Sequence, residues 1–182
     1  MVYVFWLSAS LSALSFPDHY DHDIKKAVKL HWADWPFWLD WKAQLYQESR
    51  LKPSAVSPVG AAGVAQFMPA TWKEMVSKFG YDKTSSPHDA KLAIEAGARY
   101  MSIQRRNWSS PRPQQDRQWL AQASYNAGLG NMLKAQKKCE MAVSYPGIVK
   151  CLPDITGHHS KETITYVERI SRWRYLMHWQ GQ

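Results

Sequence analysis

Apolar side chains in the first fifty residues recur at the spacing of amphipathic helices. In residues 22–32 they repeat three and four positions apart, which places them on one helical face. The apolar positions in this first run are Ile24, Ala27 and Val28, and His31 follows at the same spacing. Residues 37–47, which follow Pro36, form a second run that leads directly into Glu48. We therefore predict two helices in this part of the chain.

Helical spacing continues through most of the remaining chain. Pro69 suits the first turn of a helix that would end at Gly80. Ser86 and Asp89 are alternative N-caps of a longer helix. The apolar positions of that helix are Leu92, Ala93, Ala96, Tyr100 and Ile103. Further helices are predicted over residues 115–125, 129–138 and from Ser160 onward, where Ile164, Val167, Ile170 and Trp173 are expected to face inward.

Residues 51–66 differ in kind, because turn-forming residues crowd together there. They include Pro53, Ser54, Ser57, Pro58, Gly60 and Gly63. Residues 109–113 and the stretch with Cys and Pro after residue 138 are also expected to lack regular structure, and strand signals are nearly absent. The expected fold is mainly α: a single domain over residues 17–182 with a short irregular lobe near residues 51–66.

Composition narrows the class of protein. The chain has 182 residues, 45 % of them hydrophobic, which suits one globular domain and excludes global disorder. The net charge of +8 favours acidic partners. The basic residues are scattered and no nucleic-acid motif accompanies them, so we expect no nucleic-acid partner. Tryptophan recurs every three residues at Trp32, Trp35, Trp38 and Trp41. Packing is the favoured role of this series, and a membrane interface or sugar stacking are the alternatives.

Residues 2–16 are uncharged and largely apolar. This stretch is too short for a comfortable membrane span and has the length of a signal-peptide core, although the usual basic residues before such a core are missing. An export signal is the favoured interpretation; a membrane-associated segment and an ordinary first helix are the alternatives. We expect a periplasmic or otherwise exported protein of the cell envelope, with a virion-associated or phage-encoded protein as a further option.

Two cysteines, Cys139 and Cys151, lie close together in the sequence. In an exported protein they could close a small disulfide loop, and two unrelated buried thiols are the alternative. No spacing of Cys or His suggests a metal site, and the adjacent pair His158 and His159 would not share a face of regular structure. We expect neither a metal nor a cofactor.

Glu48 is the candidate for acid chemistry. It is the only carboxylate between Asp40 and Glu74, in a stretch that otherwise holds aromatic, methionine and small side chains. Such surroundings solvate a carboxylate poorly, so its pKa should rise, as a general acid working near neutral pH requires. By itself, this pattern favours an ordinary surface glutamate at a helix end.

Three sequence blocks, in order, resemble the soluble-type lytic transglycosylases. The first combines Glu48-Ser49 with Ser57-Pro58-Val59-Gly60, Gly63 and Gln66-Phe67-Met68-Pro69. The second is Ala123-Ser124-Tyr125-Asn126-Ala127-Gly128, and the third is Glu162-Thr163 with Tyr166-Val167. One departure is Gly63-Val64-Ala65-Gln66, where the family often carries Gly-Leu-Met-Gln; we expect this change to alter the cleft wall but not the chemistry.

The resemblance implies a lysozyme-like fold related to goose-type lysozyme, and a set of site residues. Glu48 matches the family's catalytic acid/base, and Tyr125 matches a hydroxyl close to that carboxylate. The positions implied to bind substrate are Ser57, Gln66, Phe67, Met68, Tyr125, Asn126 and Glu162.

The activity implied is cleavage of the β-1,4 bond between N-acetylmuramic acid and N-acetylglucosamine in peptidoglycan, by a monomer. The muramic acid would end as a 1,6-anhydro ring, and Glu48 would serve first as acid and then as base. Most glycosidases instead pair two carboxylates, and no second acid stands in the loop or the second block. The alternatives are a hydrolase of goose-type lysozyme character, with a second acid such as Asp82, Asp89 or Glu162, and a wall-binding module without activity.

Overall fold

The computed structural model describes residues 15–181, and every regular element in this range is a helix. The helices are α1 (Asp21–His31), α2 (Trp38–Ser49), α3 (Pro69–Phe79), α4 (Ala90–Asn107), α5 (Gln114–Ala127), α6 (Leu129–Lys138), α7 (Tyr145–Val149), α8 (Pro153–Thr156) and α9 (His159–Trp179). The mainly α prediction is confirmed. Most of the proposed signal segment, residues 1–14, lies outside the described range.

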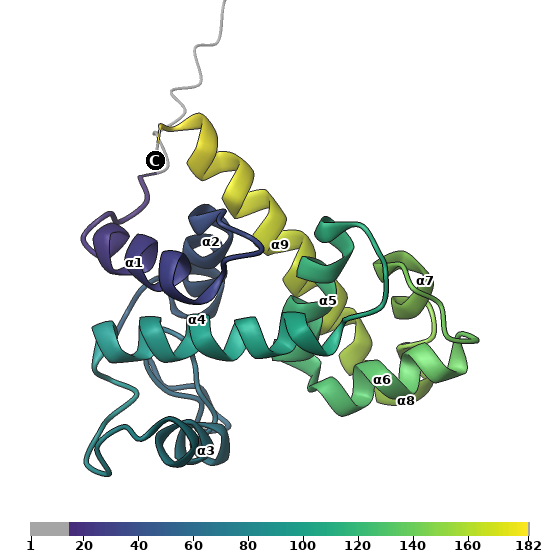
Figure 1. Cartoon of the computed structure of the whole chain (residues 1–182), viewed down its shortest axis with the longest axis horizontal. Coiled ribbons are helices and arrows are strands. Elements are labelled where there is room, and N and C mark those ends of the chain that lie inside the picture. Colours follow the sequence, from purple (N-terminus) through teal and green to yellow (C-terminus); the bar gives the residue numbers. More distant parts are fainter. Residues whose placement is uncertain (1–14, 182) are drawn as a thin grey trace, which may run out of the picture.

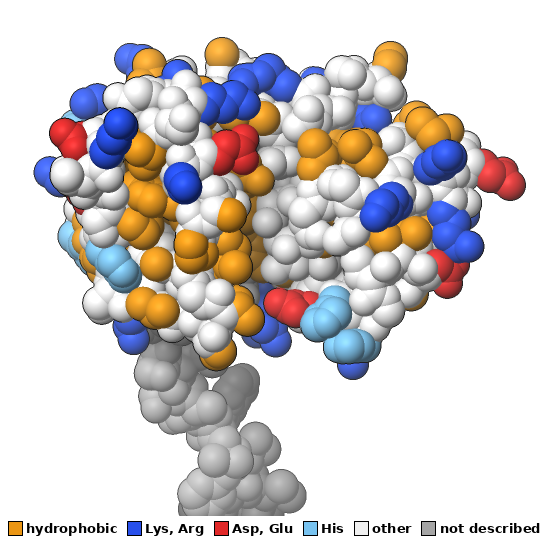
Figure 2. Space-filling view, turned by 90° about the horizontal axis from the view of Figure 1, so that it is seen from below, with side chains coloured by type: hydrophobic (Ala, Val, Ile, Leu, Met, Phe, Trp, Pro, Cys, Tyr) orange, Lys and Arg blue, Asp and Glu red, His pale blue; other side chains and the backbone are white. Residues whose placement is uncertain are grey.

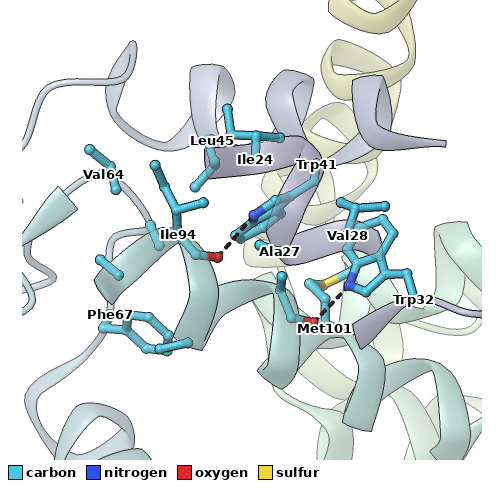
Figure 3. Packing of buried hydrophobic residues seen from close by; sticks show 14 of the residues in the cluster. Ile24, Ala27, Val28, Trp32, Trp41, Leu45, Val64, Phe67, Ile94 and Met101 are labelled. Atoms are coloured by element: carbon cyan, nitrogen blue, oxygen red, sulfur yellow. Dashed lines mark hydrogen bonds between the residues drawn. The ribbon is translucent and has the colours of Figure 1, made fainter. Parts of the chain in front are cut away.

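The long helix α9 packs along α2, and α4 crosses beside α1 and α5 (Figure 1). One hydrophobic cluster joins α1, α2, α4 and the 51–67 loop. In it, the buried indoles of Trp32 and Trp41 donate hydrogen bonds to the carbonyl oxygens of Ala98 and Ile94, at 2.7 and 3.1 Å (Figure 3). The two bonds satisfy the polar edges of the Trp32 and Trp41 rings inside the core, which confirms packing as the role of both side chains. A second hydrophobic cluster joins α5–α9.

Helix ends fall where the sequence places stop and start signals. The carboxylate of Asp89 accepts a hydrogen bond from the backbone N–H of Leu92 and caps α4, so Asp89 is the N-cap of the two candidates. Gly80 ends α3 with φ +68°, and Gly128 separates α5 from α6 with φ +84°. Both conformations favour glycine, because a Cβ atom is strained there.

The connection after α6 is more regular than the sequence suggested. It contains α7 and α8, which are five and four residues long. Ser144 caps α7 by accepting a hydrogen bond from Gly147 N at 3.1 Å, and a proline stands in the first turn of each helix. Helices this short leave no periodic pattern to read, which explains why they were missed.

Cys139 and Cys151 form a disulfide that joins the end of α6 to the turn before α8. Replacing both residues by Ser should lower the free energy of unfolding by about 2–3 kcal/mol, because the bridge restricts the unfolded chain. Urea denaturation of the variant and the oxidised wild type measures this difference. Mass analysis of unreduced protein should find no free thiol, and two free thiols would refute the bridge.

The start of the described chain belongs to the packed domain. Phe16 is buried, and its ring lies edge-on to Tyr46 of α2 and near Trp173 of α9, with centroid distances of 5.0 and 6.3 Å. A signal cleaved after Ser15 would therefore leave Phe16 in the core. Within residues 15–181, no helix has the length and apolar character needed to cross a membrane.

Candidate active site

Glu48 lies in the last turn of α2, and the backbone fixes this helix end tightly. Arg50 ends the helix in the left-handed conformation, with φ +58°, and Leu51 repeats it with φ +61°. The hydroxyl of Ser49 donates a hydrogen bond to Val64 O at 2.8 Å, which ties the helix end to the loop. Two consecutive non-glycine residues in this region are strained, and such strain is concentrated at functional sites.

The 51–67 loop is held by a small network of backbone bonds, as its turn-rich sequence predicted. Ala62 and Phe67 exchange two hydrogen bonds of 3.0 Å, and Gly63 N donates to Ala55 O at 2.9 Å. Gln66, with φ +47°, donates from its side-chain Nε2 to Ala55 O and Gly63 O at 3.2 and 3.0 Å. The hydroxyl of Ser57 accepts from Ala61 N at 2.9 Å. The predicted polar residues Ser57 and Gln66 therefore both help to shape this loop.

The carboxyl group of Glu48 has the electrostatics expected of a general acid. Burial raises its pKa from 4.5 to about 8, because an apolar environment disfavours the charged form. The hydroxyl of Tyr166, on α9, donates a hydrogen bond to Glu48 Oε1 and acts in the opposite direction, lowering the pKa. A carboxyl group with this pKa is largely protonated at neutral pH.

Tyr125 lies beside the same carboxyl group, as predicted. Its hydroxyl donates to Ala65 O at 2.6 Å, and burial together with the charge of Glu48 raises its pKa well above the ordinary value. Tyr166 responds in the same way to burial and to Glu48. Each tyrosine thus stays a neutral hydrogen-bond donor, and the pair encloses the acid with groups that carry no charge.

Two hollows adjoin this centre, of about 370 and 440 Å³. Asn126 and Glu162 line both, while Gln47 and Tyr166 line the larger one. The side-chain oxygen of Asn126 accepts a hydrogen bond from the hydroxyl of Thr163 at 2.8 Å, which joins α5 to α9. Viewed from below, the surface is recessed between the side of α3 and the side of α6–α8 (Figure 2). The structure therefore brings Asn126 and Glu162 into the same hollows, the larger of which also includes Tyr166, the hydrogen-bond partner of Glu48.

The apolar residues after the loop separate into two groups. Met68 is 43 % exposed and can contact a ligand, whereas Phe67 is only 2 % exposed and packs against Trp72, Tyr100 and Tyr125. Phe67 therefore supports the site from the core and does not present its ring to a substrate. Val64 and Ala65 are fully buried as well, so the sequence departure at these positions lies in the core and not on the cleft surface.

Sequence reasoning missed the direct partner of the acid. Tyr166 lies 118 residues from Glu48 and was noted only as part of the third block. That block was the available signal, since Glu162 and Tyr166 stand four positions apart, a spacing that puts them on one helical face. Within residues 15–181, no group of three or more His, Cys, Asp and Glu side chains could hold a metal ion.

Comparison with known proteins gives a consistent family. A family model described as the transglycosylase SLT domain matches residues 42–143, which is more than half of the chain. The membrane-bound lytic murein transglycosylase F of Marinobacter nauticus is 35 % identical over 111 residues, covering 59 % of this chain and 21 % of that protein. The chain spans about a fifth to a third of the length of such relatives.

Solved structures agree with the sequence matches. The 70 kDa soluble lytic transglycosylase of Escherichia coli superposes with a TM-score of 0.71 at 25 % identity, over 92 % of this chain and 25 % of that chain. An inactive glutamate-to-glutamine mutant of the lytic transglycosylase Slt from Pseudomonas aeruginosa gives a TM-score of 0.68 at 26 % identity, over 87 % of this chain and 24 % of that one. The lysozyme-like transglycosylase fold expected from the sequence is confirmed.

Proposed function

This chain belongs to the transglycosylase SLT family, and we propose that its domain cleaves the glycan strands of peptidoglycan as a lytic transglycosylase, with Glu48 as the acid. The observation that carries the proposal is the carboxyl group of Glu48. It lies inside the matched span, is buried enough to have a pKa of about 8, and is hydrogen-bonded by Tyr166.

In the proposed reaction, protonated Glu48 gives its proton to the oxygen that links N-acetylmuramic acid to N-acetylglucosamine. The bond from that oxygen to the muramic acid C1 breaks, and the substrate's own N-acetyl group stabilises the cation-like centre. Glu48, now a carboxylate, takes the proton of the muramic acid 6-hydroxyl, whose oxygen bonds to C1 and closes the 1,6-anhydro ring. No water is consumed, and the carboxyl group returns to its starting state.

The remaining site residues fit supporting roles in this reaction. Tyr125 and Tyr166 stay neutral and keep the surroundings of Glu48 poor in charge. We propose that Met68, Asn126 and Glu162 contact the sugar strand. Met68 is exposed, and Asn126 and Glu162 line the two hollows, which supports this role. Ser57 and Gln66 keep their proposed roles as polar groups of the cleft, in addition to their roles within the loop.

Mass spectrometry of the products released from purified peptidoglycan tests the proposal. Anhydro-muramic ends that disappear with Glu48→Gln are the expected result. Reducing ends would instead indicate a hydrolase, and Glu162, which lines both hollows, would then be the first candidate for a second acid. A well-folded protein that releases no product would refute the proposed activity.

The pH dependence of cleavage is expected to follow the protonation of Glu48. Wild-type kcat/KM should fall as the pH rises through about 8, because the acid then loses its proton. In Tyr166→Phe the hydrogen bond that lowers this pKa is gone, so the alkaline limb should move to higher pH. Rates measured between pH 5 and pH 11 locate the alkaline limbs of wild type and variant to about half a pH unit. An unmoved or lower limb in the variant would contradict the assigned role of Tyr166.

The expected location is the cell envelope, where peptidoglycan is found. The curated relatives are named as membrane-bound murein transglycosylases, which supports this placement. Association with the membrane through the apolar N-terminal residues, and a monomeric state, are parts of the same proposal.

A further inference from the structure

Three exposed aromatic side chains gather at one end of the α2–α9 pair. Phe37, just before α2, is 49 % exposed, and Tyr175 and Trp179 at the end of α9 are 61 % and 70 % exposed. The other large hydrophobic side chains exposed within residues 15–181 are aliphatic or Met. Within that range, the exposed Phe, Tyr and Trp rings therefore all lie in one small area.

These rings form a continuous surface. Phe37 and Tyr175 line an apolar hollow of about 320 Å³ together with Pro36, Trp38 and Leu39. The rings of Tyr175 and Trp179 lie 5.9 Å apart, centroid to centroid. Single exposed apolar side chains are common on proteins, but a contiguous exposed apolar surface marks a contact with a partner or a membrane.

Positive charge borders the patch. Arg172 is exposed and shares a helical face with Tyr175 and Trp179, because the three stand at positions i, i+3 and i+7 of α9. Arg174 lies 5.9 Å from the centre of the Phe37 ring and also contacts Asp40 at 3.4 Å. Amphipathic aromatic rings beside arginine are the combination found at membrane–water interfaces, and a chain with net charge +8 is attracted to anionic lipid.

We infer that this aromatic patch, defined by Phe37, Tyr175, Trp179 and Arg172, docks the domain on the surface of an anionic lipid bilayer. The inference does not depend on the proposed reaction. It also differs from anchoring by residues 1–14, because every member of the patch lies within the folded domain.

The position of the patch suits such docking. The two helices run in opposite directions, so that the start of α2 lies beside the end of α9, while Glu48 near the end of α2 reaches Tyr166 of α9. Tyr175 and Trp179 follow Tyr166 by nine and thirteen residues, roughly 14–20 Å along the helix axis. The patch and the recess therefore face different ends of the molecule (Figures 1 and 2), and a docked domain keeps its recess open to the wall.

The chain also enters at this end. Phe16 packs near Trp173, two residues before Tyr175, and the described chain begins beside the end of α9 (Figure 1). The sequence before it is uncharged and contains Tyr3, Phe5 and Trp6. An apolar segment joined to the same end is consistent with one surface meeting the membrane.

The test measures sedimentation of the full chain with phosphatidylcholine vesicles that contain or lack phosphatidylglycerol. Wild type should bind the vesicles, more tightly with phosphatidylglycerol. The double variant Tyr175→Ser/Trp179→Ser should lose roughly tenfold or more in partitioning, since both rings leave the interface. The matched control is Leu30→Ser/Met141→Ser, which removes two side chains of similar exposure, 63 % and 62 %, and should partition within about twofold of wild type.

A third variant, Arg172→Gln, should weaken binding only to vesicles with phosphatidylglycerol, because its contribution is electrostatic. Thermal melts check that each variant is folded, and Trp179→Ser alone replaces the double variant if that one is not. Three results would overturn the inference. The first is no vesicle binding by wild type, and the second is unchanged binding of the double variant, which would assign anchoring to residues 1–14. The third is a wild type that is a dimer in solution and a double variant that is a monomer, which would make the patch a contact between two copies of the chain.

Discussion

Glu48→Gln is expected to reduce peptidoglycan cleavage roughly a thousandfold or more, because glutamine keeps the shape of the side chain and has no acidic proton to give. The loss should be in kcat, since the amide can still occupy the same space beside Tyr166. Release of anhydro-muramic products over time is the measurement. The matched control is Glu168→Gln, an exposed position on α9 close in sequence to Tyr166, which should cleave at the wild-type rate. Substantial residual activity in Glu48→Gln would remove Glu48 as the acid.

The same variant should change stability in a pH-dependent way. In the folded protein the pKa of Glu48 is about 8, above the ordinary value of 4.5, so folding favours the protonated form. The wild type is therefore expected to lose stability as the pH rises from about 4.5 to about 8, while the unfolded chain releases a proton that the native state retains. Glutamine does not titrate, so Glu48→Gln should become the more stable protein across this range. Urea denaturation at acidic, neutral and alkaline pH measures the difference, and a pH-independent difference would show that Glu48 titrates normally.

Gly63→Ala should be the most damaging small substitution in the 51–67 loop. A Cβ atom at this position would lie 1.8 Å from the carbonyl oxygen of Pro87, and the backbone has φ +77°. The clash is with backbone and not with a flexible side chain, so the loop or the turn before α4 must move. Strain and overpacking together should lower the free energy of unfolding by about 2–5 kcal/mol.

Gly63→Ala should also lower the activity of the site. Gly63 accepts a hydrogen bond from the side chain of Gln66 and donates one to Ala55 O, so displacing it shifts the loop beside Glu48. We expect cleavage to fall by roughly tenfold or more even at temperatures where the variant is folded, because small displacements of positioning groups are costly.

Gly80→Ala provides the control for Gly63→Ala. Gly80 has a similar φ of +68°, but a Cβ atom there would meet nothing within 4 Å. Gly80→Ala should therefore lower the free energy of unfolding only by the strain of the left-handed conformation, about 1–2 kcal/mol, and leave the activity unchanged. Equal losses in the two variants, measured by urea denaturation, would show that the contact with Pro87 does not restrict the loop.

The sequence alone determined the longer helices and the turn-rich loop, and it identified Glu48 as the candidate acid. Helical spacing placed α1, α2, α5, α6 and the start of α9 close to their observed bounds, and Pro69 and Gly80 did so for α3, because periodicity and helix-end signals are local properties of the chain. The three ordered blocks pointed to the family that the comparisons support, and they pointed to Glu48, Tyr125 and Asn126. Proline and glycine marked the turn-rich stretch for the same local reason.

Only the tertiary structure decided how these residues act. The hydrogen bond from Tyr166 to Glu48 joins positions 118 residues apart, and the burial that raises the pKa of Glu48 depends on how α9 packs along α2. The same packing turns Phe67 into the core, leaves Met68 at the surface, and gathers Phe37 with Tyr175 at the far end of the two helices. Solvation and partner choice are properties of the assembled surface, and no local pattern of residues contains them.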